Sequence, residues 1–184
     1  MVRMSIFVWM AALLTGCAGS VNGKVADVSL NVADAIFAVL KADGKSIATV
    51  VVLSDKPKLC ETFKANREPK SATALITTLF RFSDSAYLAP EVGDYTVVGY
   101  DPTTAGSYAQ SFFSRTDANC TNTISVDASR GKSGLIKLTA FKDAKNGTAG
   151  GNFDITFGEG DRLTGSFNAS YCDISELPQS PNCE

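Results

Sequence analysis

Apolar and polar residues alternate with a period of two along most of this chain, most clearly near its C-terminus. A period of two places successive side chains on opposite faces of a β-strand. Two such runs flank the turn Gly158-Glu159-Gly160-Asp161. The pattern predicts a β-hairpin with a four-residue loop. The apolar positions expected to face the core are Phe153, Ile155, Phe157, Leu163, Phe167, Ala169 and Tyr171, whereas Asp154 and Thr156 should face solvent.

Other segments have the length and composition of strands. Residues 47–53 and 72–82 are apolar on both faces and should form the central strands. Residues 28–40 match both a strand and a helix, and their β-branched and aromatic content favours a strand. Further strands are expected at 95–100, 108–113, 124–126 and 135–141.

One short helix is expected at 56–65. Ser54 or Asp55 can cap it, Pro57 suits its first turn, and Leu59, Cys60 and Phe63 share one face. About nine short strands with one helix predict an all-β, mainly antiparallel fold, either a β-sandwich or a barrel. In a sandwich, the core would be filled by Phe80, Phe82, Phe153, Phe157 and Phe167. Residues 28–184 should form a single domain.

The N-terminal segment carries a targeting signal. Arg3 precedes the apolar run 6–14, and the run ends in Leu14-Thr15-Gly16-Cys17. This motif resembles the lipobox of bacterial lipoproteins. The resemblance implies that residues 1–16 are a signal peptide and that the sulfur of Cys17 carries a lipid. The alternative is an ordinary secretory signal that is cleaved within 15–20.

The same resemblance implies a location in the bacterial cell envelope. Ala18 stands where Asp favours retention in the inner membrane, so the outer membrane is expected, on its periplasmic or surface face. Residues 17–27 should be a lipidated flexible tether, and ten extended residues reach at most about 35 Å. The segment from Gly165-Ser166-Phe167 to Cys172 also resembles uncharacterised predicted lipoproteins.

The chain has five cysteines, and lipidation of Cys17 leaves four for disulfides. Four cysteines allow three disulfide connectivities. No two of these cysteines have the C-x-x-C spacing of a redox pair. We expect Cys60 to pair with Cys172, because one lies on the apolar helix face and the other ends the last strand. Cys120 and Cys183, in a polar loop and tail, would form the second bridge. The wide spacing does not fit a zinc site, and no metal or cofactor is expected.

The chain contains no histidine, which excludes Ser-His and Cys-His nucleophile pairs and histidine-ligated metal sites. Its formal net charge of −2 disfavours nucleic acid as a partner. A carboxylate pair could hydrolyse glycosides, and a calcium ion could bind Asp154, Glu159 and Asp161, although their spacing does not match a calcium loop. The candidate acids are Glu61, Glu68, Asp84, Glu91, Asp94, Asp154, Glu159 and Asp161.

These observations favour a membrane-anchored, non-catalytic interaction or structural module, with an envelope protein or a small molecule as its partner. The alternatives are a lipocalin-like carrier of a small apolar ligand and a carboxylate-based hydrolase. An empty apolar cavity would favour the carrier, and two acids about 5 to 9 Å apart in a cleft would favour the hydrolase. A ligand groove could also use the tyrosines Tyr87, Tyr95, Tyr100 and Tyr108.

Overall fold

The computed structural model describes residues 18–84, 86–100, 102–174 and 182–184. Eight strands form a closed barrel. In chain order they are β2 (Asp34–Ala42), β3 (Lys45–Ser54), β5 (Thr73–Ser83), β7 (Gly93–Val97), β8 (Gly106–Arg115), β9 (Gly131–Phe141), β10 (Thr148–Phe157) and β11 (Arg162–Tyr171). The all-β prediction is confirmed, and of the two architectures left open the chain adopts the barrel.

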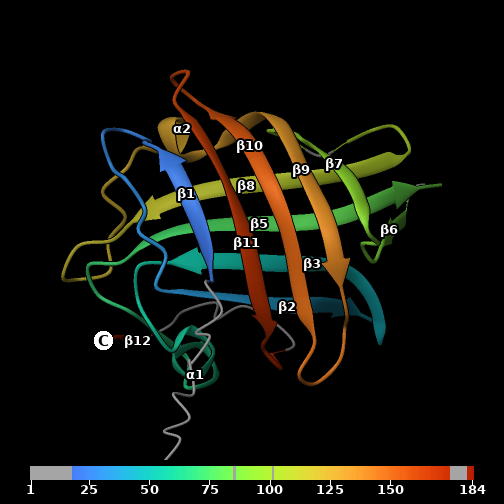
Figure 1. Ribbon diagram of the computed structural model, residues 1–184, viewed down its shortest axis with the longest axis horizontal. Coiled ribbons are helices and arrows are strands. Elements are labelled where there is room, and N and C mark those ends of the chain that lie inside the picture. Colours follow the sequence, from blue (N-terminus) through green and yellow to red (C-terminus); the bar gives the residue numbers. More distant parts are fainter. Residues whose placement is uncertain (1–17, 85, 101, 175–181) are drawn as a thin grey trace, which may run out of the picture.

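Around the barrel, the strand order is β11-β10-β9-β7-β8-β5-β3-β2, and β2 returns to β11. The contacts β11–β2 and β7–β8 are parallel, and the other contacts of the ring are antiparallel. In Figure 1, β9, β10 and β11 cross steeply in front of the wall formed by β2, β3, β5 and β8. The barrel is therefore flattened, with two walls whose strands cross at a large angle.

Residues 18–27 of the segment expected to be a flexible tether are instead part of the fold. Strand β1 (Gly19–Gly23) pairs antiparallel with residues 163–167 of β11, and Asn168 donates a backbone hydrogen bond to Ala18. Val25 is fully buried, and the amide of Ala26 donates to the carboxylate of Asp161. The expectation was wrong because small polar residues are typical of a linker. Here they form a strand, and its hydrogen-bonding partner, β11, lies far along the chain.

The expected helix is present but shorter. Helix α1 spans Leu59–Lys64, and its first amide donates to the carboxylate of Asp34, 2.9 Å away at the start of β2. Neither predicted cap is used. Ser54 accepts from the amide of Lys56, and Asp55 accepts from the amide of Thr73. A residue distant in sequence therefore caps the helix.

Two strand expectations fail in part. Residues 124–126 form no strand, because Ser125 caps the short helix α2 (Val126–Ser129) by accepting from the amide of Ala128. Strand β7 ends at Val97 and does not reach 100. Besides β1, three short strands of the described residues lie outside the barrel ring: β6 (Ala86–Leu88) pairs antiparallel with the end of β5, and β4 (Arg67–Glu68) pairs with β12 (Asn182–Cys183).

The barrel interior is filled by side chains. Phe153, Ile155 and Phe157 are all buried there, which confirms the predicted register of the C-terminal hairpin. Between the described residues, a cavity of about 10 Å³ lies in the interior at Phe153 and Phe167. This volume is close to the minimum of about 10 to 15 Å³ that one water molecule requires.

Two of the five phenylalanines assigned to a sandwich core lie elsewhere. Phe80 and Phe82 point outward from β5, because inward positions on this strand are odd-numbered. Both rings pack against Tyr87 of β6, with centroids 5.2 and 5.4 Å away. Strand β6 therefore covers apolar side chains on the outer surface of the barrel.

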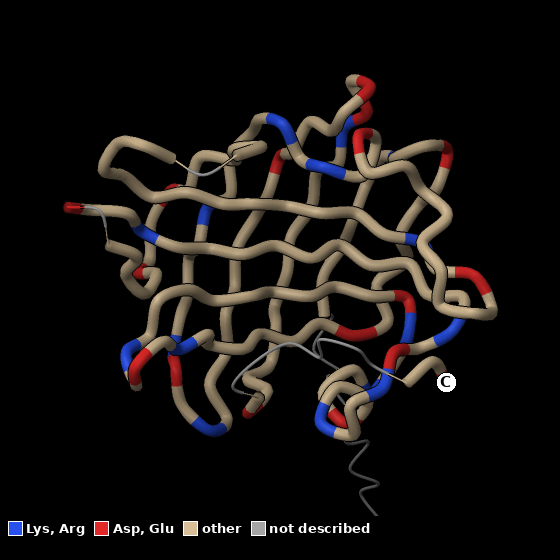
Figure 2. Tube along the Cα trace, turned by 180° about the vertical axis from the view of Figure 1, so that it is seen from behind, with Lys and Arg blue, Asp and Glu red and all other residues tan. Residues whose placement is uncertain are grey.

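The wall formed by β3, β5 and β8 is uncharged along most of its length. Figure 2 shows Lys, Arg, Asp and Glu gathered at strand ends and loops around this wall. The outward side chains of β3 and β5 include Val50, Val52 and Ile76, which pack in a second apolar cluster with Leu59 and Phe63 of α1. This second cluster explains why both faces of these strands are apolar in sequence.

Candidate functional site

An apolar groove lies on the outer surface of the barrel, beside α1. Its volume is about 220 Å³. We call it the α1 groove, and its lining residues are Val52, Ser54, Leu59, Phe63, Glu68, Pro69, Ala72, Ala74, Ile76, Ser114 and Thr116. Strands β3, β5 and β8 provide the floor, helix α1 one wall, and the segment 68–72 the other.

The first wall is fixed by a disulfide and a helix cap. Leu59 and Phe63 are four residues apart, so they lie on the same face of α1 and both line the groove. Cys60 forms a disulfide with Cys172, which directly follows β11 and is fully buried. The bond from the Leu59 amide to Asp34 fixes the start of the helix.

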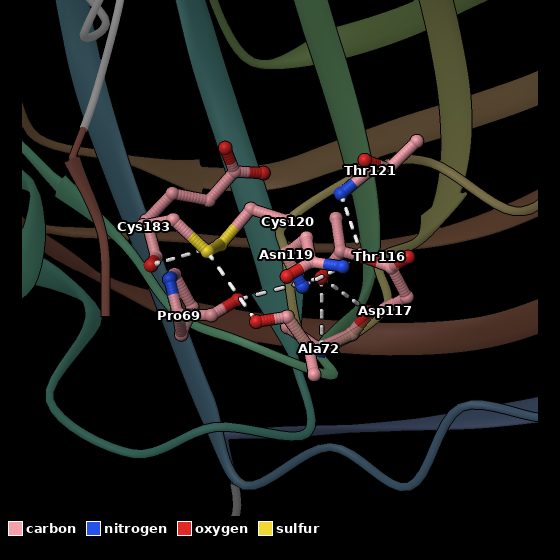
Figure 3. Close-up of a disulfide and its surroundings, with 10 residues drawn as sticks. Pro69, Ala72, Thr116, Asp117, Asn119, Cys120, Thr121 and Cys183 are labelled. Carbon is pink, nitrogen blue, oxygen red and sulfur yellow. Dashed lines mark hydrogen bonds between the residues drawn. A yellow bond between two sulfur atoms is a disulfide. The ribbon is translucent and has the colours of Figure 1, made fainter.

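The second wall is fixed by the other disulfide. Cys120 is bonded to Cys183, and Cys183 of β12 pairs with Glu68 of β4. Figure 3 shows this disulfide next to Pro69 and Ala72. The sulfur of Cys120 lies 3.5 Å from the carbonyl oxygen of Glu68, a plain contact because a disulfide sulfur carries no hydrogen. Both disulfides thus match the predicted pairs, and each supports one wall of the groove.

Backbone hydrogen bonds add to the support of this wall. The amide of Ala72 donates to the hydroxyl of Thr116 at 3.0 Å, and the amide of Ser71 donates to the carbonyl of Asp117. The Asp117 carboxylate accepts the amides of Asn119 and Thr121, which shapes the turn that presents Cys120 (Figure 3). The wall is held at several points, so the groove is pre-formed.

Glu68 is the charged residue among the described residues that line the groove. Its side chain is partly buried, and burial raises the pKa of its carboxyl above the ordinary value. The neighbouring cation, Arg67, is paired with Glu184. Among the described residues, no ion pair or hydrogen bond reaches the Glu68 carboxylate. A partly desolvated carboxylate without a partner is a candidate contact for a cation.

A wider and more polar depression adjoins the α1 groove. It has a volume of about 520 Å³ and shares Ile76 with the groove. Tyr100 and Arg130 line it, and both are exposed. No disulfide supports its walls among the described residues, so we regard the α1 groove as the better-defined site.

The remaining candidate residues are dispersed. Asp154 is paired with Arg162, which lowers the pKa of its carboxyl. The described part of the chain contains no group of three or more acidic, Cys or His side chains that could hold a metal ion. Glu61 lines a separate surface depression with Arg67 and Glu184. Glu68 therefore supplies the single carboxylate among the described residues of the groove.

The tyrosines also separate. Tyr95 is buried in the barrel, with its hydroxyl bonded to the backbone of Glu91. Tyr87 and Tyr108 pack around Phe80, and Tyr100 lines the wider depression. None of the four lines the α1 groove. Cys17 lies outside the described residues, so its lipidation stays a prediction.

Sequence reasoning did not single out the groove. It found Leu59, Cys60 and Phe63 as one helix face, and it included Glu68 among the scattered acids. The apolar outer positions of β3 and β5 were the available signal that something packs outside the barrel.

Comparison with protein-family models, with curated proteins and with solved structures finds no match to this chain. In the described residues, no helix is both long enough and apolar enough to cross a bilayer.

Proposed function

We propose that this protein is a bacterial envelope lipoprotein, anchored by a lipid on Cys17, whose barrel is a non-catalytic interaction module that binds its partner in the α1 groove. The observation that carries this proposal is the pre-formed groove, whose two walls are each held by a disulfide. Two disulfides also fit an exported protein, because the reducing cytosol disfavours them.

The barrel interior bears on the carrier alternative. A lipocalin-like carrier needs an internal volume for its ligand, and small-molecule sites usually measure about 300 to 1,000 Å³. The cavity found in the barrel interior among the described residues measures about 10 Å³. We therefore place ligand binding on the outer surface.

The hydrolase alternative requires two carboxyl groups about 5 to 9 Å apart across a cleft. The described residues of the α1 groove provide one carboxyl group, that of Glu68. One carboxyl group is enough for a binding role, whereas the hydrolytic mechanism requires two.

Metabolic labelling with a fatty acid tests the anchor. We expect the wild-type protein to incorporate label, and Cys17→Ala to lose it, because the thioether carries the acyl chains. Thr15→Ala is the matched control in the same motif and should keep the label. Equal labelling of wild type and Cys17→Ala, or no label in either, would overturn the lipoprotein proposal.

A further inference from the structure

The α1 groove combines features that together specify a ligand. Its floor and first wall are apolar, through Ile76, Leu59 and Phe63. Its second wall carries the partly buried carboxylate of Glu68, which has no partner among the described residues. An apolar surface next to one unpaired anion is complementary to an apolar group with one positive charge.

We propose that the α1 groove binds a small amphiphilic amine, with its apolar chain on Leu59, Phe63 and Ile76 and its ammonium group against the Glu68 carboxylate. This inference rests on the proposed function, since it names the ligand class of the same groove.

The size of the groove favours a small molecule over a protein segment. Its volume of about 220 Å³ lies below the range of about 300 to 1,000 Å³ that is usual for drug-sized ligands. Disulfide-held elements bound it on two sides, so it cannot widen without moving α1 or the segment 68–72. A short alkyl chain fits these limits.

Electrostatics favours a cation. A partly desolvated carboxylate attracts an ammonium group more strongly than a fully hydrated one does, because the effective dielectric constant is lower. Arg67 cannot easily neutralise the Glu68 carboxylate, because its guanidinium group is already paired with Glu184. An anionic amphiphile would bring a second negative charge toward Glu68 and should bind more weakly.

Three probes with the same six-carbon chain test the proposal: n-hexylammonium, 1-hexanol and n-hexanoate. Each is titrated into the purified full chain, with both disulfides formed, while the methyl NMR signals of Ile76 and Leu59 are followed. We expect n-hexylammonium to bind about tenfold more tightly than n-hexanoate, with 1-hexanol between them.

Two variants locate the effect. Glu68→Gln should remove the preference for n-hexylammonium and leave the affinity for 1-hexanol unchanged. This variant should fold normally at neutral pH, because burial already disfavours the charged form of Glu68. Glu61→Gln, on helix α1 but not among the groove-lining residues, is the matched control and should keep the full preference.

The outcomes separate the two proposals. If the three probes bind equally, or if n-hexanoate binds most tightly, the amine proposal is wrong and the groove remains a binding site. If n-hexylammonium keeps its preference in Glu68→Gln, the assignment of the charge to Glu68 is wrong. If no probe shifts the Ile76 or Leu59 signals, both the amine proposal and the binding role of the groove fail.

Discussion

At the scale of single residues, two threonines inside the barrel differ in how their hydroxyl groups are satisfied. Thr77 and Ser111 share a hydrogen bond of 3.1 Å between β5 and β8. The hydroxyl of Thr49 on β3 is fully buried and has no hydrogen-bond partner among the described residues. A buried polar group without a partner costs about 1 to 3 kcal/mol of stability.

We predict opposite effects for valine at these two positions. Thr49→Val should raise the free energy of unfolding by about 1 kcal/mol, because it removes an unsatisfied hydroxyl at nearly constant shape. Thr77→Val should lower it by about 1 kcal/mol, because it leaves the Ser111 hydroxyl unpaired. Chemical denaturation measures both. Destabilisation by Thr49→Val would show that its hydroxyl is satisfied after all.

At the scale of elements, the close pairing of β1 with β11 depends on a glycine. A Cβ atom added to Gly165 would lie 2.0 Å from the carbonyl oxygen of Ser20 in β1 and 2.7 Å from the ring of Phe153. At Gly150 of β10, the nearest atoms would lie 3.7 Å away, an ordinary contact. Gly165 therefore permits β1 to join the barrel.

Substituting alanine for Gly165 and, separately, for Gly150 should distinguish the effect of close backbone contact from the effect of strand propensity. Gly165→Ala should lower the free energy of unfolding by about 2 kcal/mol or more, through overpacking against backbone. Gly150→Ala should change it by less than about 1 kcal/mol. Hydrogen exchange provides a second reading, since the amides of β1 should lose protection in Gly165→Ala. Unchanged protection there would contradict this role of Gly165.

The elements also show what sequence patterns can and cannot predict. The C-terminal hairpin was predictable because its alternation is local and one face is buried. The cap of α1 was not, because Asp34 lies 25 residues before the amide that it binds. Strand β1 was missed for the same reason: its pairing partners are 140 to 148 residues away, and its own composition resembles a linker.

The candidate site was only partly predictable. The cysteine pairs followed from where each cysteine lay in the strand and helix pattern, and the structure contains both. The burial of Glu68 could not be inferred in this way. It depends on β12 and the Cys120 turn, which reach this wall from distant parts of the chain.

At the scale of the whole molecule, the two disulfides tie C-terminal residues to opposite walls of the α1 groove. They differ in exposure. Cys172 is fully buried, whereas Cys183 is exposed. Thiol–disulfide exchange requires access of the attacking thiolate to a sulfur atom. The wall that carries Glu68 is therefore the more sensitive of the two to a reducing agent.

We expect graded reduction of the protein to open Cys120–Cys183 before Cys60–Cys172. Alkylation of free thiols followed by peptide mass spectrometry gives the order. At the intermediate stage, amides of segment 67–70 should exchange faster, because Glu184 of the released tail binds Glu68 and Lys70. The barrel strands should keep their protection. Earlier labelling of Cys60 and Cys172 would contradict this order.

Strand β1 has a consequence for how the protein would search for its ligand. It begins at Gly19, so Cys17 and the first residue of β1 are two positions apart and at most about 7 Å of chain separates them. A lipid on Cys17 would hold the barrel against the headgroups and let it move sideways. The protein would then diffuse in two dimensions at the membrane surface. Amphiphilic amines also concentrate there, because their apolar chains partition into lipid.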